Sequence, residues 1–206
     1  MIDYFGLLGE PRRPWLEPQA LKARFLSVSI QTHPDRVHNE SSFTRKAATD
    51  TYADLNAAYA CLRETKTRLQ HLLELEQGSK PKAVQEGPPG MMDVFTQVSQ
   101  LCRLVDGFLA ERNGLHSPLL RVQGFEKGFE WIDKLNALNK QLATRLNELT
   151  AELQRMNAVW DEAPPLGSPA RLSALPLERL EQVCQLCGYL TRWMTQIQER
   201  LVQLSL

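Results

Sequence analysis

The chain has little of what secreted and membrane proteins need. Its four cysteines are spread over 206 residues, too few and too scattered for the disulfide framework of a secreted domain. No run of about twenty apolar residues occurs, and the first residues lack the basic and apolar stretches of a signal peptide. We therefore expect a cytoplasmic protein without a leader or a transmembrane segment.

The chain also has no excess of charge of either sign. Lysine and arginine together number 24, and aspartate and glutamate also number 24, so the formal net charge is zero. Nucleic acids and anionic membrane surfaces attract proteins chiefly through fields of basic side chains. The composition therefore predicts neither a nucleic acid nor a membrane as a partner.

Patterns typical of β-strands are missing too. There is no sustained alternation of apolar and polar residues rich in valine, isoleucine and threonine. Prolines and glycines interrupt helical patterns at a linker (78–90), a long loop (161–176) and a shorter break (113–124). The sequence predicts an all-α protein with one domain over residues 1–77 and a second over 91–206.

Three apolar stripes with heptad-like spacing fill the second domain. Steps of three and four residues are the spacing by which helices bury one another's side chains in bundles. The stripes are Met91, Val94, Phe95, Val98, Leu101, Cys102, Val105, Phe108 and Leu109; Ile132, Leu135, Asn139, Leu142, Leu146, Leu149, Leu153, Met156 and Trp160; and Leu180, Val183, Cys187, Leu190, Met194, Ile197, Leu201 and Leu204. We expect an elongated antiparallel three-helix bundle whose two long helices form a coiled-coil-like hairpin. Pairing of the same stripes between two copies of the chain is the alternative.

The first domain begins with the signals of two short helices. Asp3 can cap a first helix that ends near Gly9. Pro18 can occupy the first turn of a second helix, and Pro34 forces that helix to end at about residue 32 or 33.

Two further helices follow a polar loop. Ser41 or Ser42 can cap the third helix, along which apolar residues recur at steps of three and four. The apolar residues of the third helix are Tyr52, Leu55, Tyr59 and Leu62, and those of the fourth are Leu69, Leu72, Leu73 and Leu75. The second and third helices should form an antiparallel pair, with the tripeptide His33-Pro34-Asp35 at the tip of the loop that joins them.

This order of elements resembles the J-domain of DnaJ-type co-chaperones. The resemblance covers residues 2–76 and rests on Asp3-Tyr4-Phe5, on Leu8-Gly9, on His33-Pro34-Asp35-Arg36 and on the third helix over residues 55–63. It implies four helices in this domain.

Further details are similar to HscB, the co-chaperone of iron–sulfur assembly. They are Gln19-Ala20-Leu21, Arg24-Phe25 and Val28 before the tripeptide, and Arg68 and Leu72-Leu73 after it. The layout of a J-domain, a short linker and a three-helix domain is also similar, although over residues 91–206 the resemblance concerns architecture alone.

The resemblance implies that the loop binds a DnaK- or HscA-type chaperone and stimulates its ATP hydrolysis. Asp35 can offer a carboxylate to an arginine of the partner, and Pro34 fixes the shape of the loop before binding. His33 can cap or brace the preceding helix. The basic residues expected to assist chaperone binding are Lys22, Arg24 and Arg36.

The second helix departs from the family in its charge. J-domains in general carry basic residues just before the tripeptide, which face an acidic surface of the chaperone. Here the matching positions hold Leu26, Ser27 and Gln31. We expect weaker electrostatic steering than in other members of the family.

Cys184 and Cys187 form a CxxC motif inside a helical stripe. Redox-active pairs instead stand at the start of a helix that follows a strand, and thiols inside a stripe pack as small apolar groups.

No second pair of ligands completes a metal site, and no nucleotide-binding or hydrolase motif occurs. We expect a protein that is not an enzyme and uses no metal or cofactor. A thiol redox protein is the alternative from another class.

A client-binding surface is expected at the start of the second domain. Met91, Met92 and Phe95 are apolar side chains that could form an exposed patch, and their burial in the bundle or against the J-domain is the alternative. The sequence thus predicts a co-chaperone that presents a client, an iron–sulfur scaffold in the HscB-like version. A J-protein whose coiled coil targets or oligomerises it with an unrelated client is the other version.

Overall fold

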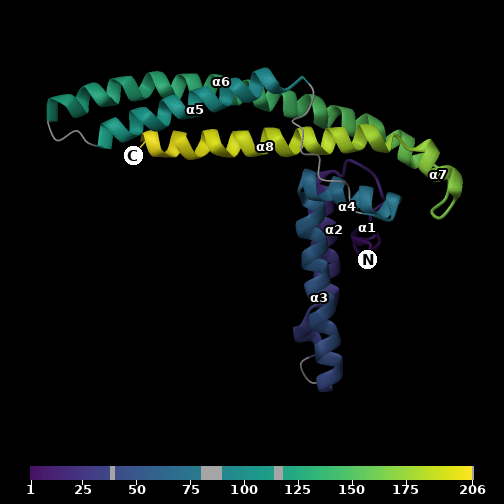
Figure 1. The fold of residues 1–206 in the computed structure, drawn as a ribbon. Coiled ribbons are helices and arrows are strands. Elements are labelled where there is room, and N and C mark those ends of the chain that lie inside the picture. The colour runs from purple at the N-terminus through teal and green to yellow at the C-terminus, as the bar shows by residue number, and fades with distance from the viewer. Residues whose placement is uncertain (38–39, 80–89, 114–117, 206) are drawn as a thin grey trace. The chain divides into compact units, whose positions relative to one another are not determined.

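The computed structural model describes residues 1–37, 40–79, 90–113 and 118–205, without the side chains of residues 36, 37, 113 and 118–125. These residues form helices and no strand, so the all-α prediction is confirmed (Figure 1). The elements are α1 (Tyr4–Leu8), α2 (Pro18–Thr32), the 3-10 turn η1 (Pro34–Val37), α3 (Ser42–Arg63), α4 (Thr65–Gln77), α5 (Met92–Asn113), α6 (Pro118–Asp161), α7 (Pro169–Ala174) and α8 (Leu177–Ser205). None of the described helices is long and apolar enough to cross a membrane.

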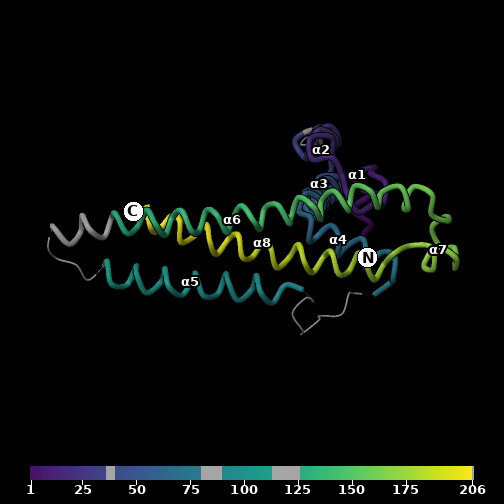
Figure 2. Tube along the Cα trace, turned by 90° about the horizontal axis from the view of Figure 1, so that it is seen from above, coloured from purple at the N-terminus to yellow at the C-terminus, as the bar shows by residue number. Residues whose placement is uncertain are grey.

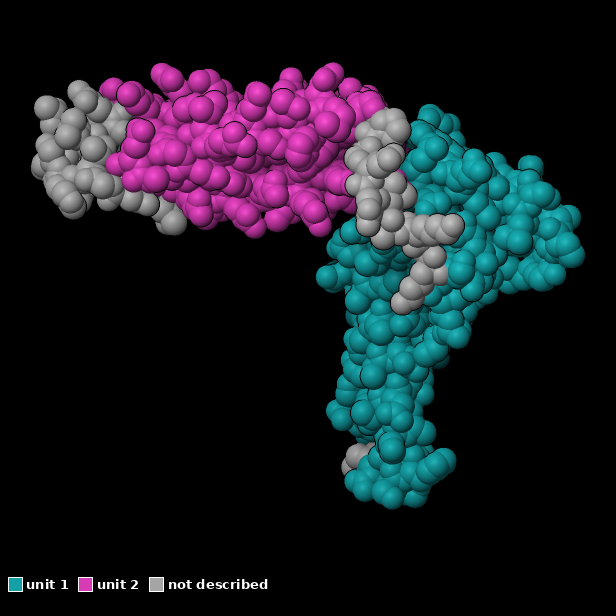
Figure 3. Space-filling view, in the orientation of Figure 1, with its two compact units in different colours: residues 1–82, 150–184 teal, residues 83–149, 185–206 magenta. Residues whose placement is uncertain are grey.

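The chain divides into two compact units, coloured separately in Figure 3. The first unit contains residues 1–82 and 150–184, and the second contains residues 83–149 and 185–206. The unit with the four N-terminal helices therefore also contains the end of α6, all of α7 and the start of α8. The predicted linker lies, apart from its ends, outside the described residues, and the predicted domain boundaries stay a prediction.

The N-terminal helices begin and end where local signals predict. Asp3 caps α1 by accepting hydrogen bonds from the backbone N–H groups of Phe5 and Gly6, and Gly9 ends it in the left-handed conformation that glycine adopts at little cost. Pro18 lies in the first turn of α2, and the hydroxyl of Ser41 caps α3. Helices α2 and α3 pack antiparallel, so the loop between them lies at the end of the pair (Figure 1).

Two predictions for the C-terminal half are wrong in detail. The expected loop over residues 161–176 contains α7, because Pro169 is pre-set for the first turn of a helix. The expected break over residues 113–124 is shorter, since α6 already begins at Pro118. Gly124 lies inside α6, because one glycine costs a helix only about 1 kcal/mol.

In the second unit, α5, α6 and α8 lie side by side (Figures 1 and 2). Parts of the predicted apolar stripes of these three helices meet in one core. Its buried members are Met91, Val98, Cys102, Val105, Leu109, Leu135, Leu138, Leu142, Leu190, Trp193, Ile197 and Leu204. Five further stripe residues are buried and belong to the first unit: Leu153, Met156, Trp160, Leu180 and Val183.

Candidate functional site

The loop between α2 and α3 carries the tripeptide on a sharp turn. His33 ends α2 with an extended backbone (φ −61°, ψ 132°), because the proline ring that follows excludes the helical conformation. Pro34 then begins the single 3-10 turn η1. The chain therefore leaves the helix at one residue and presents the next two at the tip.

The ring of His33 is fixed from two sides. Its Nδ1 accepts a hydrogen bond from the backbone N–H of Asp35 at 3.3 Å. Its edge meets the ring of Tyr52 in α3, with 5.0 Å between the ring centroids. The backbone of His33 thus ends α2, and its ring braces the tripeptide against α3. Sequence reasoning identified Tyr52 only as a residue of the apolar stripe.

Asp35 presents its carboxylate to solvent. Its side chain is 90% exposed, and one carboxylate oxygen lies 3.5 Å from Nδ1 of His33. The histidine contacts hold the backbone of Asp35 in place while most of the carboxylate surface stays accessible. A carboxylate in this arrangement can accept two hydrogen bonds from one arginine of another protein.

The three basic residues predicted to assist binding have different surroundings. Lys22 is exposed on α2. Arg24 donates a hydrogen bond from Nε to the carbonyl oxygen of Leu8 at 3.0 Å, and a β-carbon at Gly9 would lie 2.5 Å from its guanidinium. Arg24 therefore ties α2 to the end of α1, a role that the sequence did not reveal. The side chain of Arg36 lies outside the described residues.

The end of the unit away from the loop contains two buried polar side chains, Arg68 and His71. Arg68 donates hydrogen bonds to the carbonyl oxygens of Pro14 at 2.9 Å and Leu62 at 2.7 Å. Nε2 of His71 accepts a hydrogen bond from the backbone N–H of Tyr4 at 3.1 Å. Burial lowers the pKa of His71, so the neutral ring that accepts this bond is favoured.

Two further contacts join the N-terminal helices to the C-terminal segments of the same unit. The side chain of Asn157 in α6 accepts from the backbone N–H of Trp15 at 3.0 Å and donates to its carbonyl oxygen at 2.9 Å. Arg171 in α7 forms two parallel hydrogen bonds to the carboxylate of Glu76 in α4, at 2.7 and 2.8 Å. Both side chains of this ion pair are almost fully buried.

The predicted client-binding patch is divided between the core and the surface. Met91 is buried in the core of the second unit and cannot belong to an exposed patch. Met92 is 60% exposed and Phe95 47% exposed. The ring of Phe95 lies 6.2 Å from that of Trp193 in α8. The accessible part of the predicted patch therefore consists of Met92 and Phe95. The ring of Phe95 lies near an aromatic side chain of α8.

Cys184 of the CxxC motif lies in surroundings that suppress thiol chemistry. Both sulfurs are buried, and burial raises the pKa of the Cys184 thiol to about 11. The Cys184 thiol donates to the carbonyl oxygen of Lys66 at 3.6 Å. Since the thiolate is the reactive form, a neutral thiol here is a poor nucleophile at physiological pH. Across the described ranges, no group of three or more potential ligands could hold a metal ion.

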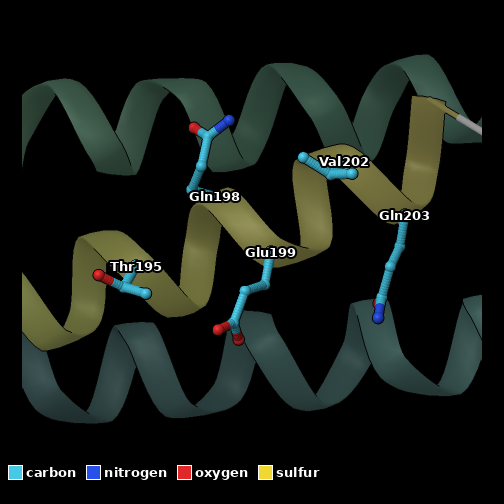
Figure 4. Close-up of a pocket in the computed structure, with 5 residues that line it drawn as sticks. All are labelled: Thr195, Gln198, Glu199, Val202 and Gln203. Carbon is cyan, nitrogen blue, oxygen red and sulfur yellow. The ribbon is translucent and has the colours of Figure 1, made fainter.

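A surface hollow on α8 is shown in Figure 4. The residues that line it all come from this one helix: Thr195, Gln198, Glu199, Val202 and Gln203. Glu199 is the one ionisable side chain among them. A single carboxylate without a second acid, base or nucleophile gives this hollow no arrangement for catalysis.

The comparison with solved structures agrees with this architecture. No family model matches the sequence. Among solved structures, the chain is similar to the chaperone HscB from Vibrio cholerae, with 20% sequence identity and a TM-score of 0.53. The match covers 95% of this chain and 99% of that chain. The chain therefore has an HscB-like all-α fold.

Proposed function

We propose that this chain is a cytoplasmic J-type co-chaperone that stimulates the ATP hydrolysis of a DnaK- or HscA-type chaperone. The observation that carries the proposal is the exposed carboxylate of Asp35, held at the tip of an antiparallel helix pair in an HscB-like fold. The chain acts by binding, without catalytic chemistry of its own.

The loop geometry supports a rigid docking element. Pro34 and the contacts of His33 with Asp35 and Tyr52 hold the tripeptide in place before the partner arrives. A loop that is already ordered loses less conformational entropy on binding, which raises affinity. The Asp35 carboxylate can then pair with an arginine of the chaperone, and a bidentate pair of this kind also fixes orientation.

The client surface is proposed at the start of α5. Met92 and Phe95 are exposed apolar side chains. The ring of Phe95 lies near that of Trp193, which in turn lies 5.8 Å from the ring of Tyr189. Exposed apolar clusters of this kind are typical of protein–protein contacts. The resemblance to HscB favours an iron–sulfur scaffold protein as the client.

The chaperone activity is tested with a substitution at the tip of the loop. The ATPase rate of a purified DnaK-type chaperone is measured with the full-length chain and with Asp35→Asn. We expect stimulation by the wild type and none by Asp35→Asn at unchanged melting temperature, because the side chain is almost fully exposed. Full stimulation by the variant would contradict the proposal.

The client is tested separately. Binding of a purified iron–sulfur scaffold is measured with the wild type and with the double variant Met92→Ser/Phe95→Ser. We expect the scaffold to bind the wild type, and the double variant to lose this binding while it still stimulates the chaperone. If the scaffold binds neither protein, the iron–sulfur role is wrong and the chaperone activity is unaffected.

A further inference from the structure

Two surface hollows of the second unit adjoin each other between α6 and α8. The first is the hollow of Figure 4, and the second shares Thr195 and Gln198 with it. We call the two hollows together the α6–α8 groove. The second hollow is lined by Asn139 and Leu146 of α6 and by Thr191, Met194, Thr195 and Gln198 of α8.

The α6–α8 groove contains almost no charge. Charged side chains make up 23% of the chain, yet Glu199 is the one ionisable residue among those that line the two hollows. In Figure 4, Glu199 points to the opposite side of α8 from Gln198, the residue that also lines the hollow shared with α6. Glu199 therefore stands at the outer edge of the groove, and the floor of the groove is neutral. A highly charged partner would lose hydration on this floor without gaining an ion pair.

The floor of the groove holds an unsatisfied hydrogen-bond acceptor. The side-chain oxygen of Asn139 is buried, and no described residue donates a hydrogen bond to it. A buried acceptor of this kind costs free energy until a donor reaches it. Gln198, which lines the same hollow, carries an amide group with two donor hydrogens. A copy of this face therefore presents the kind of donor that Asn139 lacks.

The two edges of the groove carry opposite charges at nearly the same level. Glu199 borders the α8 side, and Lys140, which is exposed and directly follows Asn139, borders the α6 side. Asn139 and Gln198 line the same hollow, so the two charged residues that follow them lie within about one helical turn of each other along the groove. Neither Lys140 nor Glu199 forms an ion pair with another residue of the described chain.

We propose that a second copy of this chain docks on the α6–α8 groove, with α6 of each copy against α8 of the other. A two-fold axis parallel to the helices produces this arrangement and places Lys140 of each copy beside Glu199 of the other. It also brings Gln198 of one copy to the level of Asn139 of the other. The groove is thus complementary to itself in charge and in hydrogen bonding. The proposal does not depend on the proposed function, because the groove lies in the second unit and the tripeptide in the first.

The size of the groove sets the strength of this contact. Its lining residues reach from residue 191 to residue 203 of α8, which is about 18 Å at 1.5 Å per residue. Two helices packed about 10 Å apart present about 400 Å² over this length. This area is typical of weak, reversible complexes rather than of permanent dimers, so we expect a dissociation constant of about 10 to 100 μM.

Sedimentation velocity of the chain between about 1 and 300 μM tests the proposal, with monomer expected at the low end and dimer at the high end. Lys140→Glu should raise the dissociation constant about tenfold or more, because two carboxylates then oppose each other at both symmetric contacts. Lys140→Glu/Glu199→Lys should restore dimerisation, since the pairs form again with their signs exchanged. Both positions are exposed, so the melting temperature should stay unchanged.

A mixture of single variants identifies the partner as a second copy. Lys140→Glu and Glu199→Lys should each dimerise poorly alone, whereas an equimolar mixture should dimerise, because both contacts then join opposite charges. The matched control is Lys134→Glu, the same charge reversal on α6. Lys134 is also exposed, but it lies over the ring of Trp131, which contacts Phe108 of α5 and so marks the other side of the helix. The control should dimerise like the wild type.

Three results would overturn the proposal. The first is a wild type that stays monomeric at about 300 μM. The second is a dimer that Lys140→Glu leaves unchanged or that the double reversal fails to restore, since the groove would then not be the contact. The third is a dimer that only Lys134→Glu disrupts, which would assign the contact to the side of α6 next to α5.

Discussion

The two ends of the N-terminal helix pair are built from different kinds of contact. At the loop end, His33 and Asp35 contact each other and one aromatic ring, and much of each side chain faces solvent. At the opposite end, Arg68 and His71 are buried and hydrogen-bonded to backbone groups from distant segments. The side chains of His33 and Asp35 are thus accessible to solvent, whereas the opposite end uses its polar groups within the chain.

This difference predicts where a substitution changes folding and where it changes binding. Removing one member of a buried polar pair leaves the other without a partner in a medium of low polarity, which costs stability. Removing an exposed carboxylate such as Asp35 leaves folding unchanged and affects the complex with a partner. Asp35→Asn should therefore abolish stimulation of the chaperone while leaving the melting temperature nearly unchanged.

The largest expected effect on stability is at the ion pair between Arg171 and Glu76. Arg171→Ala should reduce the free energy of unfolding by about 3–5 kcal/mol, because it leaves the buried Glu76 carboxylate unpaired. Chemical denaturation followed by circular dichroism measures this change.

A second ion pair in the same unit provides a matched control. Arg179 also forms two hydrogen bonds to a carboxylate, that of Glu152, at 2.7 and 2.9 Å. These side chains are much more exposed than those of the first pair. Arg179→Ala should therefore cost less than about 1 kcal/mol. Equal losses for both variants would show that burial does not decide the contribution of these pairs.

The same contrast between buried and exposed neighbours occurs at the start of α5. Met91→Ala should destabilise the second unit by about 2–5 kcal/mol, because Met91 is part of its core. Met92→Ala removes an equal side chain from an exposed position and should cost about 0.5 kcal/mol or less. Thermal melting of the two single variants measures the difference. A greater loss for Met92→Ala would contradict the assignment of Met92 to the surface.

Local features of this structure could be predicted from sequence, and long-range ones could not. The caps at Asp3 and Ser41 and the end of α2 before Pro34 depend on a few neighbouring residues. The Arg171–Glu76 pair joins residues 95 positions apart, and no local pattern marks either residue as a member of a pair. The burial of Met91 is also a long-range feature that no local pattern predicts.

Adjacent apolar residues at the start of a helix carry the same sequence signal whether they face the core or solvent. Their separation depends on the exact rotation of α5 against α6 and α8. Exposure of Leu26 and Ile30 follows from the packing of α2 on α3, which is a property of the folded chain.

A smaller effect is expected from pH at the end away from the loop. Burial lowers the pKa of His71 below its usual value of about 6.5, against the opposing influence of Asp3 and Glu74, while Arg12 lowers it further. Below that usual value the unfolded chain binds a proton that the folded chain resists, so stability falls as the pH falls.

The pH effect is measured as the melting temperature between pH 7.5 and pH 5.5. The wild type should melt at a lower temperature at the acidic end of this range. In His71→Gln, the side-chain oxygen can still accept the hydrogen bond from Tyr4, but it does not titrate. The variant should therefore lose less melting temperature over the same range. An equal loss in both proteins would assign the pH dependence to other groups.

The smallest expected effect is on the rate of association at the loop end. Because residues 25–32 carry no charge, binding of the wild-type chain to its chaperone should depend only weakly on salt. Ser27→Lys/Gln31→Lys places two positive charges on α2 close to the tripeptide. With a chaperone whose surroundings at this site are acidic, the association rate should rise a few-fold at low ionic strength, and the gain should disappear at about 0.5 M salt. The dissociation rate should change little, since the contacts formed after docking are the same.

Stopped-flow association measurements at several salt concentrations separate the two rates. If the association rate is unchanged at every salt concentration with a chaperone of this charge, α2 does not face the chaperone during the encounter.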